Sequence, residues 1–211
     1  MEKLVILEID KQQVKAREGM TVLEAAREAD IEIPTLCYHE KLKPYGVCRI
    51  CSVEVEKEGR VRIVASCGYP VGEGLIIRTH SPRIDRIRKG IIELIAPAVM
   101  ANGDVAGKIK KLAEEYGADI HRFESRYRVT PSRCILCGIC VRYCDEIVGA
   151  HAIGFVGRGI DRRVAFFPEE ARACITCGAC TDLCPVSKFA AETDFVVFDG
   201  LTVDDWLTRK S

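Results

Sequence analysis

The sequence predicts an α+β protein with three consecutive parts. Short segments of alternating hydrophobicity and one capped helix fill residues 1–80, and amphipathic helical segments fill most of residues 81–131. Two copies of a cysteine-rich run follow in residues 132–195. Strand-forming and helix-forming patterns that are segregated along the chain in this way are typical of α+β proteins.

Residues 1–80 are expected to form a small mixed sheet around one helix. Five segments rich in apolar residues are expected to be strands, and residues 51–56 alternate between apolar and polar residues: residues 3–10, 14–16, 51–56, 61–66 and 75–79. Thr21 and Glu24 form a capping box, which predicts a short helix directly after Thr21. Two strands, a helix, a cysteine-containing loop and three further strands match the β-grasp plan.

Residues 81–131 are expected to be a helical linker without metal ligands. Apolar side chains recur at helical spacing over residues 83–96, namely Ile84, Ile87, Ile91, Ile92, Leu94 and Ile95. Pro97 is expected to close this helix, because proline lacks an amide hydrogen. A second amphipathic helix is expected over residues 105–116. We interpret both apolar stripes as core packing.

The balance of charge excludes several classes of partner. Basic and acidic residues number 31 each, so no net field attracts nucleic acid or an anionic membrane. No apolar run approaches the roughly 20 residues of a membrane span, and the start MEKLVILEID lacks the features of a secretory signal. We therefore expect a cytoplasmic protein with no nucleic-acid partner and no direct membrane span.

The twelve cysteines are expected to bind metal. Cytosolic thiols are kept reduced, which disfavours a disulfide framework. The cysteines divide into three sets of four.

Residues 132–195 contain an internal repeat. The runs RCILCGICVRYC (133–144) and ACITCGACTDLC (173–184) share the spacing CxxCxxCxxxC, and a proline follows the second. This spacing matches the bacterial two-cluster ferredoxin run, in which the fourth cysteine binds the other cluster. We expect the first three cysteines to wrap one cluster and the fourth to start a helix that points away.

This rule predicts two [4Fe–4S] sites with crossed ligands. The first consists of Cys134, Cys137, Cys140 and Cys184, and the second of Cys144, Cys174, Cys177 and Cys180. Gly138 and Gly178 lie mid-loop, where a missing Cβ lets backbone amides approach the sulfurs. A pair of zinc sites is the alternative, but zinc usually takes two CxxC pairs set well apart.

Cys37, Cys48, Cys51 and Cys67 form the remaining set. Their spacing resembles the plant-type [2Fe–2S] pattern, although the gap after Cys37 is longer. Because CxxC is shared by both kinds of site, the spacing favours [2Fe–2S] and leaves zinc open. His39 follows Cys37 closely, but four thiolates already complete either site, so we expect His39 to be a surface residue or a neighbour of the ligands.

Taken together, these segments resemble a known family. LCYHEKLKPYGVCRICSVEVE with ASCGYPV and LIIRTHSPRI resembles the N-terminal [2Fe–2S] domain of the large, 75-kDa-type iron–sulfur subunit of respiratory complex I. The same module occurs in the small diaphorase subunit of NAD-reducing hydrogenases, in iron-only hydrogenases and in NAD-linked formate dehydrogenases. RCILCGICVRYCDEI and RACITCGACTDLCP resemble the two-cluster domain that follows there. The resemblance implies one [2Fe–2S] cluster on Cys37, Cys48, Cys51 and Cys67, because the longer first gap is normal in this family.

One part departs from the family pattern. A site of one histidine and three cysteines for a further [4Fe–4S] cluster usually lies between the two domains. Residues 82–131 contain no cysteine in this chain. We therefore expect that cluster to be absent.

The pattern indicates an electron-relay subunit with no catalytic residues of its own. The resemblance implies two partners, a flavoprotein that oxidises NAD(P)H and a terminal redox enzyme such as a hydrogenase, a formate dehydrogenase or a bifurcating complex. The apolar tail, residues 196–211, is expected to dock on this chain's core or on a partner. A free-standing polyferredoxin-type carrier is the alternative, and a zinc-organised interaction protein is a third possibility.

Overall fold

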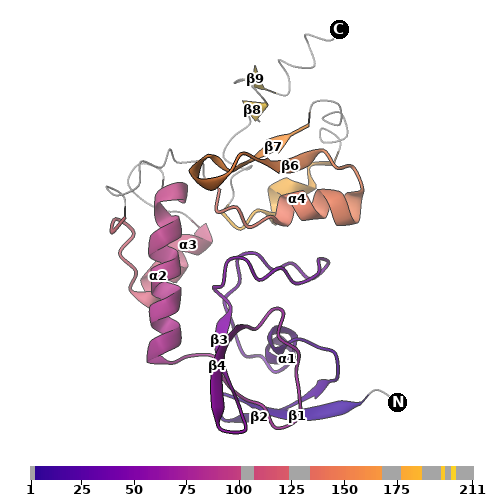
Figure 1. The fold of residues 1–211 in the computed structure, drawn as a ribbon, viewed down its shortest axis with the longest axis vertical. Helices are drawn as coiled ribbons and strands as arrows, with labels where there is room; N and C mark the ends of the chain where they lie inside the picture. Colours follow the sequence, from indigo (N-terminus) through magenta and orange to yellow (C-terminus); the bar gives the residue numbers. More distant parts are fainter. Residues whose placement is uncertain are drawn as a thin grey trace. The chain divides into compact units, whose positions relative to one another are not determined.

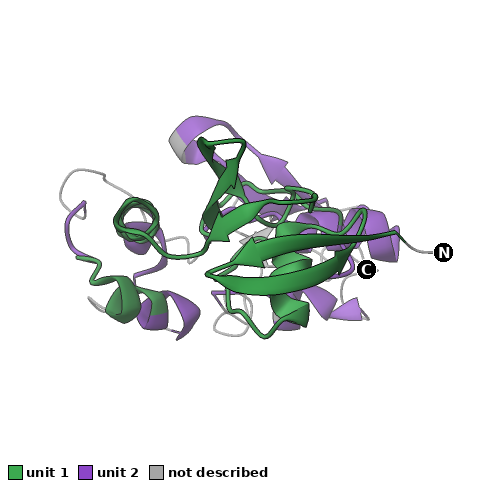
Figure 2. Cartoon of the chain, turned by 90° about the horizontal axis from the view of Figure 1, so that it is seen from below, with its two compact units in different colours: residues 1–38, 43–94, 112–119 green, residues 39–42, 95–111, 120–211 purple. Residues whose placement is uncertain are grey.

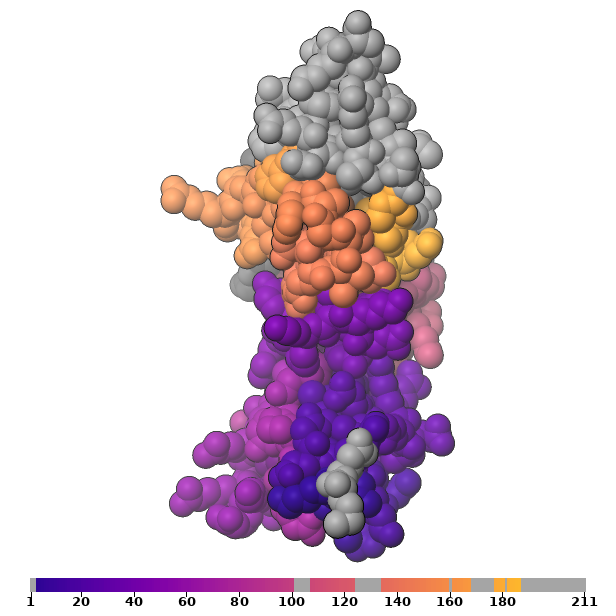
Figure 3. All heavy atoms as spheres, turned by 90° about the vertical axis from the view of Figure 1, so that its right-hand side faces the viewer, coloured from indigo at the N-terminus to yellow at the C-terminus, as the bar shows by residue number. Residues whose placement is uncertain are grey.

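The computed structural model describes residues 3–100, 107–123, 134–167 and 177–186, and the backbone of residues 196–197 and 201–202 (Figure 1). The chain forms two compact units, coloured separately in Figure 2. The first contains residues 1–38, 43–94 and 112–119, and the second contains residues 39–42, 95–111 and 120–211. Figure 3 shows the heavy atoms of the chain as spheres, coloured along the sequence.

The first unit contains a mixed five-stranded sheet and one short helix. The strands are β1 (Leu4–Ile9), β2 (Gln12–Arg17), β3 (Ser52–Lys57), β4 (Arg60–Ala65) and β5 (Ile76–Arg78), in the order β2-β1-β5-β3-β4. Only the pair β1–β5 is parallel, and the other pairs are antiparallel. Helix α1 (Val22–Glu28) connects β2 to the cysteine loop. The predicted α+β class is confirmed.

Two tight hairpins set the register of the sheet. Asp10 and Lys11 join β1 to β2, and Glu58 and Gly59 join β3 to β4, all four with positive φ. Two consecutive residues with positive φ make the type I′ turn, whose twist matches that of paired strands. The second hairpin places Cys51, the residue before β3, close to Ser66 and Cys67, the residues that follow β4.

Helix α1 begins as the sequence predicts. The Thr21 hydroxyl accepts a hydrogen bond from the Glu24 amide at 3.3 Å, and the Thr21 amide donates to the Glu24 carboxylate at 2.7 Å. This reciprocal pair satisfies two amides at the helix start. The helix buries Val22, Leu23, Ala25 and Ala26 in the core of the sheet.

Helix α2 (Pro82–Val99) is longer than predicted. Pro97 lies inside its last turn, so the expectation that Pro97 closes the helix is wrong. A proline so near the C-terminus removes a single helical hydrogen bond, and the buried side chains of Ile92 and Ala96 hold the turn in place. Leu94 was expected in the core but is 56% exposed. The second helix, α3, spans Gly107–Tyr116.

The second unit repeats one small motif. Helices α4 (Ile139–Tyr143) and α6 (Ala179–Leu183) each start directly after a glycine in the left-handed conformation. In each copy the helix contains the third cysteine and ends before the fourth. The expectation that the fourth cysteine starts a helix is confirmed for Cys144, which begins the π-helix η1 (Cys144–Val148), and is wrong for Cys184, which is extended.

The remaining elements of the second unit are short. Strands β6 (Ile153–Val156) and β7 (Arg163–Phe166) form an antiparallel hairpin around the 3-10 turn η2 (Gly159–Asp161). Most of the predicted docking tail lies outside the described residues, apart from β8 (Val196–Val197) and β9 (Leu201–Thr202). In the described parts of the chain, no helix combines the length and the apolar character needed to span a membrane.

The capping box gives a test of the fold. Thr21→Ala removes the acceptor for the Glu24 amide and should lower the free energy of unfolding by about 1 kcal/mol. Denaturant unfolding of the full chain under anaerobic conditions measures this change. Thr21→Ser keeps the hydroxyl and should stay close to the parent protein. Equal losses in both variants would assign the effect to the methyl group instead.

Candidate metal centres

The β3–β4 hairpin brings two of the four N-terminal cysteines together. Cys51 directly precedes β3, Cys67 follows β4, and Ser52 is paired with Ala65 in the hairpin register. Ser66 donates from its amide at 3.1 Å and from its hydroxyl at 2.8 Å to the Cys51 carbonyl. These bonds hold the segment between the two cysteines in a fixed conformation.

The other two cysteines come from the long loop after α1. Cys37 is buried, whereas Cys48 is partly exposed. The Cys48 amide lies 3.5 Å from the Cys37 sulfur and donates to it. Gly46 precedes Cys48 with a φ of +65°, and a Cβ at this glycine would lie 3.9 Å from the Cys67 sulfur. The left-handed conformation, which glycine adopts without strain, thus lets this loop pass close to Cys67.

The four thiols affect one another's pKa in two pairs, Cys37 with Cys48 and Cys51 with Cys67. A hydrogen bond from the Cys37 thiol lowers the pKa of Cys48 to about 6, and one from the Cys67 thiol lowers the pKa of Cys51 to about 6. The same hydrogen bonds, reinforced by burial, raise the pKa of Cys37 and of Cys67. In each pair the interaction favours the thiolate form of one member, and the thiolate is the form that binds metal.

The contacts of His39 are with residues other than these thiols. Its Nδ1 accepts a hydrogen bond from the Lys41 amide at 3.2 Å, and its ring meets the edge of the Tyr143 ring at 5.6 Å. The short segment from His39 to Leu42 belongs to the second compact unit.

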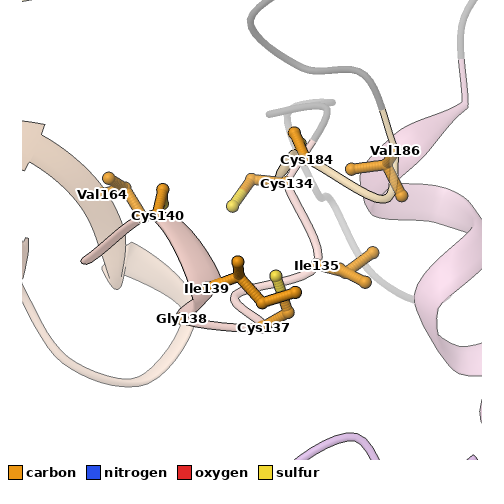
Figure 4. Close-up of a pocket in the computed structure, with 9 residues that line it drawn as sticks. All are labelled: Cys134, Ile135, Cys137, Gly138, Ile139, Cys140, Val164, Cys184 and Val186. Atoms are coloured by element: carbon orange, nitrogen blue, oxygen red, sulfur yellow. The ribbon is translucent and has the colours of Figure 1, made fainter. Parts of the chain in front are cut away.

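Four cysteines of the second unit line one cavity. They are the three leading cysteines of the first run and the last cysteine of the second run: Cys134, Cys137, Cys140 and Cys184. The cavity encloses about 330 Å³, including space open to solvent, and its other walls are Ile135, Gly138, Ile139, Val164 and Val186. Figure 4 shows the sulfurs of Cys134 and Cys137 directed into the space between the labelled residues.

Three cysteines of the other predicted set are also neighbours. Cys144 packs beside Cys180 in a small apolar cluster. Burial, together with the smaller effects of the nearby Cys177 and Cys144, raises the pKa of Cys180 to about 11. The fourth predicted member, Cys174, lies outside the described residues.

Backbone amides donate to two sulfurs of the first run, one from each predicted set. The Leu136 amide donates to Cys134 at 3.3 Å, and the Ala152 amide donates to Cys144 at 3.3 Å. Burial raises the pKa of the Cys140 thiol, and the adjacent thiols of Cys137 and Cys134 raise it further. A metal that binds such buried thiols must displace their protons and supply the positive charge that keeps them ionised.

The chemistry of these donors fits iron–sulfur clusters. Each set offers thiols, apolar walls and backbone N–H donors, which are the features that hold and tune such clusters. Among the described side chains, no group of three or more His, Cys, Asp or Glu converges closely enough to hold a single metal ion.

Sequence reasoning missed two buried charged residues in α2. Arg88 and Glu93 are 0% and 1% exposed. The Arg88 guanidinium contacts the backbone beside Cys51, as described below. Its position was detectable, because Arg88 follows Ile84 and precedes Ile92 by four residues each and so lies on the apolar face of the helix.

Two family models match the chain. The "2Fe-2S iron-sulfur cluster binding domain" matches residues 2–82, and the "NADH-quinone oxidoreductase subunit 3, ferredoxin-like domain" matches residues 127–190. The chain therefore combines a [2Fe–2S] domain with a ferredoxin-like domain, in the order that the sequence predicts.

Similar proteins belong to NAD(P)H-linked enzymes. The mitochondrial NADH-ubiquinone oxidoreductase 78 kDa subunit of Neurospora crassa is 33% identical over 89% of this chain and 28% of its own length. The NADPH-Fe(3+) oxidoreductase subunit alpha of Geobacter sulfurreducens is 35% identical over 90% of this chain and 24% of its own length. The chain thus spans about a quarter of the length of these two relatives.

The match to one solved structure extends over a larger share of the similar protein's own chain. A chain of the NAD+-reducing [NiFe]-hydrogenase in the H2-reduced state is 31% identical, with a TM-score of 0.66 over 77% of this chain and 74% of that one. The resemblance inferred from the sequence is confirmed. The chain belongs to the iron–sulfur protein family that includes the 78 kDa subunit of NADH-ubiquinone oxidoreductase and a chain of the NAD+-reducing [NiFe]-hydrogenase.

Proposed function

We propose that this chain relays single electrons between a flavoprotein subunit that oxidises NAD(P)H and a partner redox enzyme. The observation that carries the proposal is the cavity shared by Cys134, Cys137, Cys140 and Cys184. Its fourth cysteine comes from the other run, which is the crossed ligand pattern of two-cluster ferredoxins. A chain with this pattern and a [2Fe–2S] domain has the parts of a relay.

The proposal assigns all twelve cysteines to three clusters. Cys37, Cys48, Cys51 and Cys67 hold one [2Fe–2S] cluster. One [4Fe–4S] cluster takes the four cysteines of the cavity, and the other takes Cys144, Cys174, Cys177 and Cys180. We place the domain boundaries near residues 80, 131 and 195, with residues 196–211 as a docking segment.

The protein supplies the environment of these clusters. Bound iron–sulfur clusters accept and release one electron at a time with little rearrangement. Ile135, Ile139 and Val164 give the first cavity an apolar wall. The amides of Leu136 and Ala152 donate to sulfur and thereby stabilise its negative charge.

The proposed partners follow from the relatives. The names of the similar proteins all include a nicotinamide cofactor: NADH-ubiquinone oxidoreductase, NADPH-Fe(3+) oxidoreductase and NAD+-reducing hydrogenase. We expect the terminal partner to be a hydrogenase, a formate dehydrogenase or a bifurcating complex in the cytoplasm. Neighbouring genes that encode one of these enzymes would identify it.

Purification of a tagged chain from its native host under anaerobic conditions tests the proposal. A flavoprotein should copurify, and NAD(P)H should then reduce the clusters, as seen by EPR. The isolated chain should be reduced by dithionite but not by NAD(P)H. A monomer that never copurifies with a partner would support the free-standing carrier, and a colourless protein with stoichiometric zinc would support the zinc-organised module.

The iron content tests the cluster assignment. Protein purified anaerobically should contain about ten iron atoms and about ten acid-labile sulfides, the sum of one [2Fe–2S] and two [4Fe–4S] clusters. Colorimetric iron and sulfide analysis measures both. Substantially more iron would contradict the loss of the histidine-containing cluster from residues 82–131.

A matched pair of variants tests the crossed ligands. Cys184→Ser should impair the cluster bound by Cys134, Cys137 and Cys140, whereas Cys144→Ser should impair the other one. Each substitution should therefore alter one of the two reduced [4Fe–4S] signals in EPR and leave the [2Fe–2S] signal in place. If both substitutions altered the same signal, the crossed assignment would be wrong.

A further inference from the structure

Arg88 is fully buried beside the loop that carries two candidate ligands of the [2Fe–2S] site. It belongs to helix α2 of the first unit and is 0% exposed. Its Nε donates to the Ile50 carbonyl at 3.2 Å, and its Nη2 donates to the Ser52 carbonyl at 3.0 Å. These carbonyls belong to the two residues that flank Cys51, so the guanidinium binds the backbone on both sides of a candidate ligand.

The third contact of Arg88 comes from helix α3. Its Nη1 donates to the Tyr116 hydroxyl at 2.9 Å, and the guanidinium carbon lies 5.4 Å from the centre of the Tyr116 ring. The His80 ring stacks on Tyr116 with ring centres 6.2 Å apart. Tyr116 stays a neutral phenol, because burial raises its pKa to about 12. The two linker helices therefore share the task of holding Arg88 in place.

The groups that accept hydrogen bonds from Arg88 are all neutral, although the carboxylate of the exposed Glu115 acts on the same Tyr116 hydroxyl. Its three acceptors are two backbone carbonyls and a phenol, and within the described parts of the chain no carboxylate pairs with it. The nearby buried carboxylate, Glu93, is oriented toward the Asp119 amide at 3.2 Å and Lys89 at 3.9 Å. A buried cation is strongly unfavourable unless an anion lies near it.

A thiolate-bound [2Fe–2S] cluster would supply that anion. A two-iron centre with four thiolate ligands carries a net negative charge. This charge increases by one when the centre takes up an electron. A fixed positive charge nearby favours the more negative form and so raises the reduction potential. Burial strengthens the effect, because water does not screen the interaction.

We propose that Arg88 is a positioning residue that raises the reduction potential of the [2Fe–2S] site by placing an unpaired buried charge behind the Cys51 backbone. The step concerned is the uptake of one electron, with no bond made or broken. This inference rests on the proposed [2Fe–2S] ligand set. It gives the linker a role even though residues 82–131 contain no cysteine: the helices hold a charge beside the neighbouring cluster.

Redox titration of the full, cluster-loaded chain, followed by the EPR signal of the reduced [2Fe–2S] centre, tests the proposal. Arg88→Gln removes the charge and should lower the potential, and a tenfold loss of reduced centre at fixed potential corresponds to 59 mV. Arg88→Lys keeps the charge and should stay nearer to the parent protein. Arg83→Gln removes an exposed arginine from the same helix and should change nothing.

The outcomes separate the inference from the proposed function. A parent protein without a [2Fe–2S] signal would refute the ligand set itself. A parent signal with an unchanged potential in Arg88→Gln would refute only the role of Arg88. Equal shifts in Arg88→Gln and Arg88→Lys would show that hydrogen-bond geometry, and not charge, sets the potential.

Tyr116→Phe keeps the test decisive if both Arg88 variants fail to retain the cluster. This substitution removes one acceptor and leaves the charge of Arg88 in place. The potential should then match that of Arg83→Gln. A marked fall in potential in Tyr116→Phe would contradict the charge-based account.

Discussion

Thiolates repel one another, so several of them can be buried together only if protons or metal ions compensate their charge. Both cysteine-rich regions of this chain show the consequence. Cys37 and Cys67 hold their protons through hydrogen bonds to the thiolates of Cys48 and Cys51, and burial raises the pKa of Cys140. Iron ions in a cluster would replace those protons and satisfy the thiolates together. The hairpins, loops and glycine turns of both units serve to present thiols in this arrangement.

The second unit presents its thiols through a repeated motif. A glycine with positive φ, a helix around the third cysteine and a fourth cysteine beyond it recur in both runs. Cys184 lines the cavity of the other run, so the first copy does not complete that cavity alone. The exchange of one ligand between the copies that we propose would explain why the motif is duplicated within a single unit.

The first unit relies on a sheet instead. The register of β3 and β4 brings Cys51 close to Cys67, and α1 leads into the loop that carries Cys37. Helix α2 adds Arg88, whose charge is buried without a carboxylate partner in the described chain. In our proposal this charge complements the cysteine loop electrostatically and gives the linker a role, although residues 82–131 contain no cysteine.

The sequence by itself determined the features that depend on near neighbours in the chain. The capping box of Thr21 and Glu24, the cysteine spacing and the left-handed glycines involve residues a few positions apart, so local rules predict them. Pro97 and Leu94 broke local rules, because packing of the rest of α2 decided where the helix ends and which face is buried. The spacing of the two runs also predicted that Cys184 would join Cys134, Cys137 and Cys140, and these four cysteines line one cavity. Only the tertiary structure placed Arg88 behind Cys51. That contact joins residues far apart in the sequence, and no local pattern encodes which distant group a buried charge will meet.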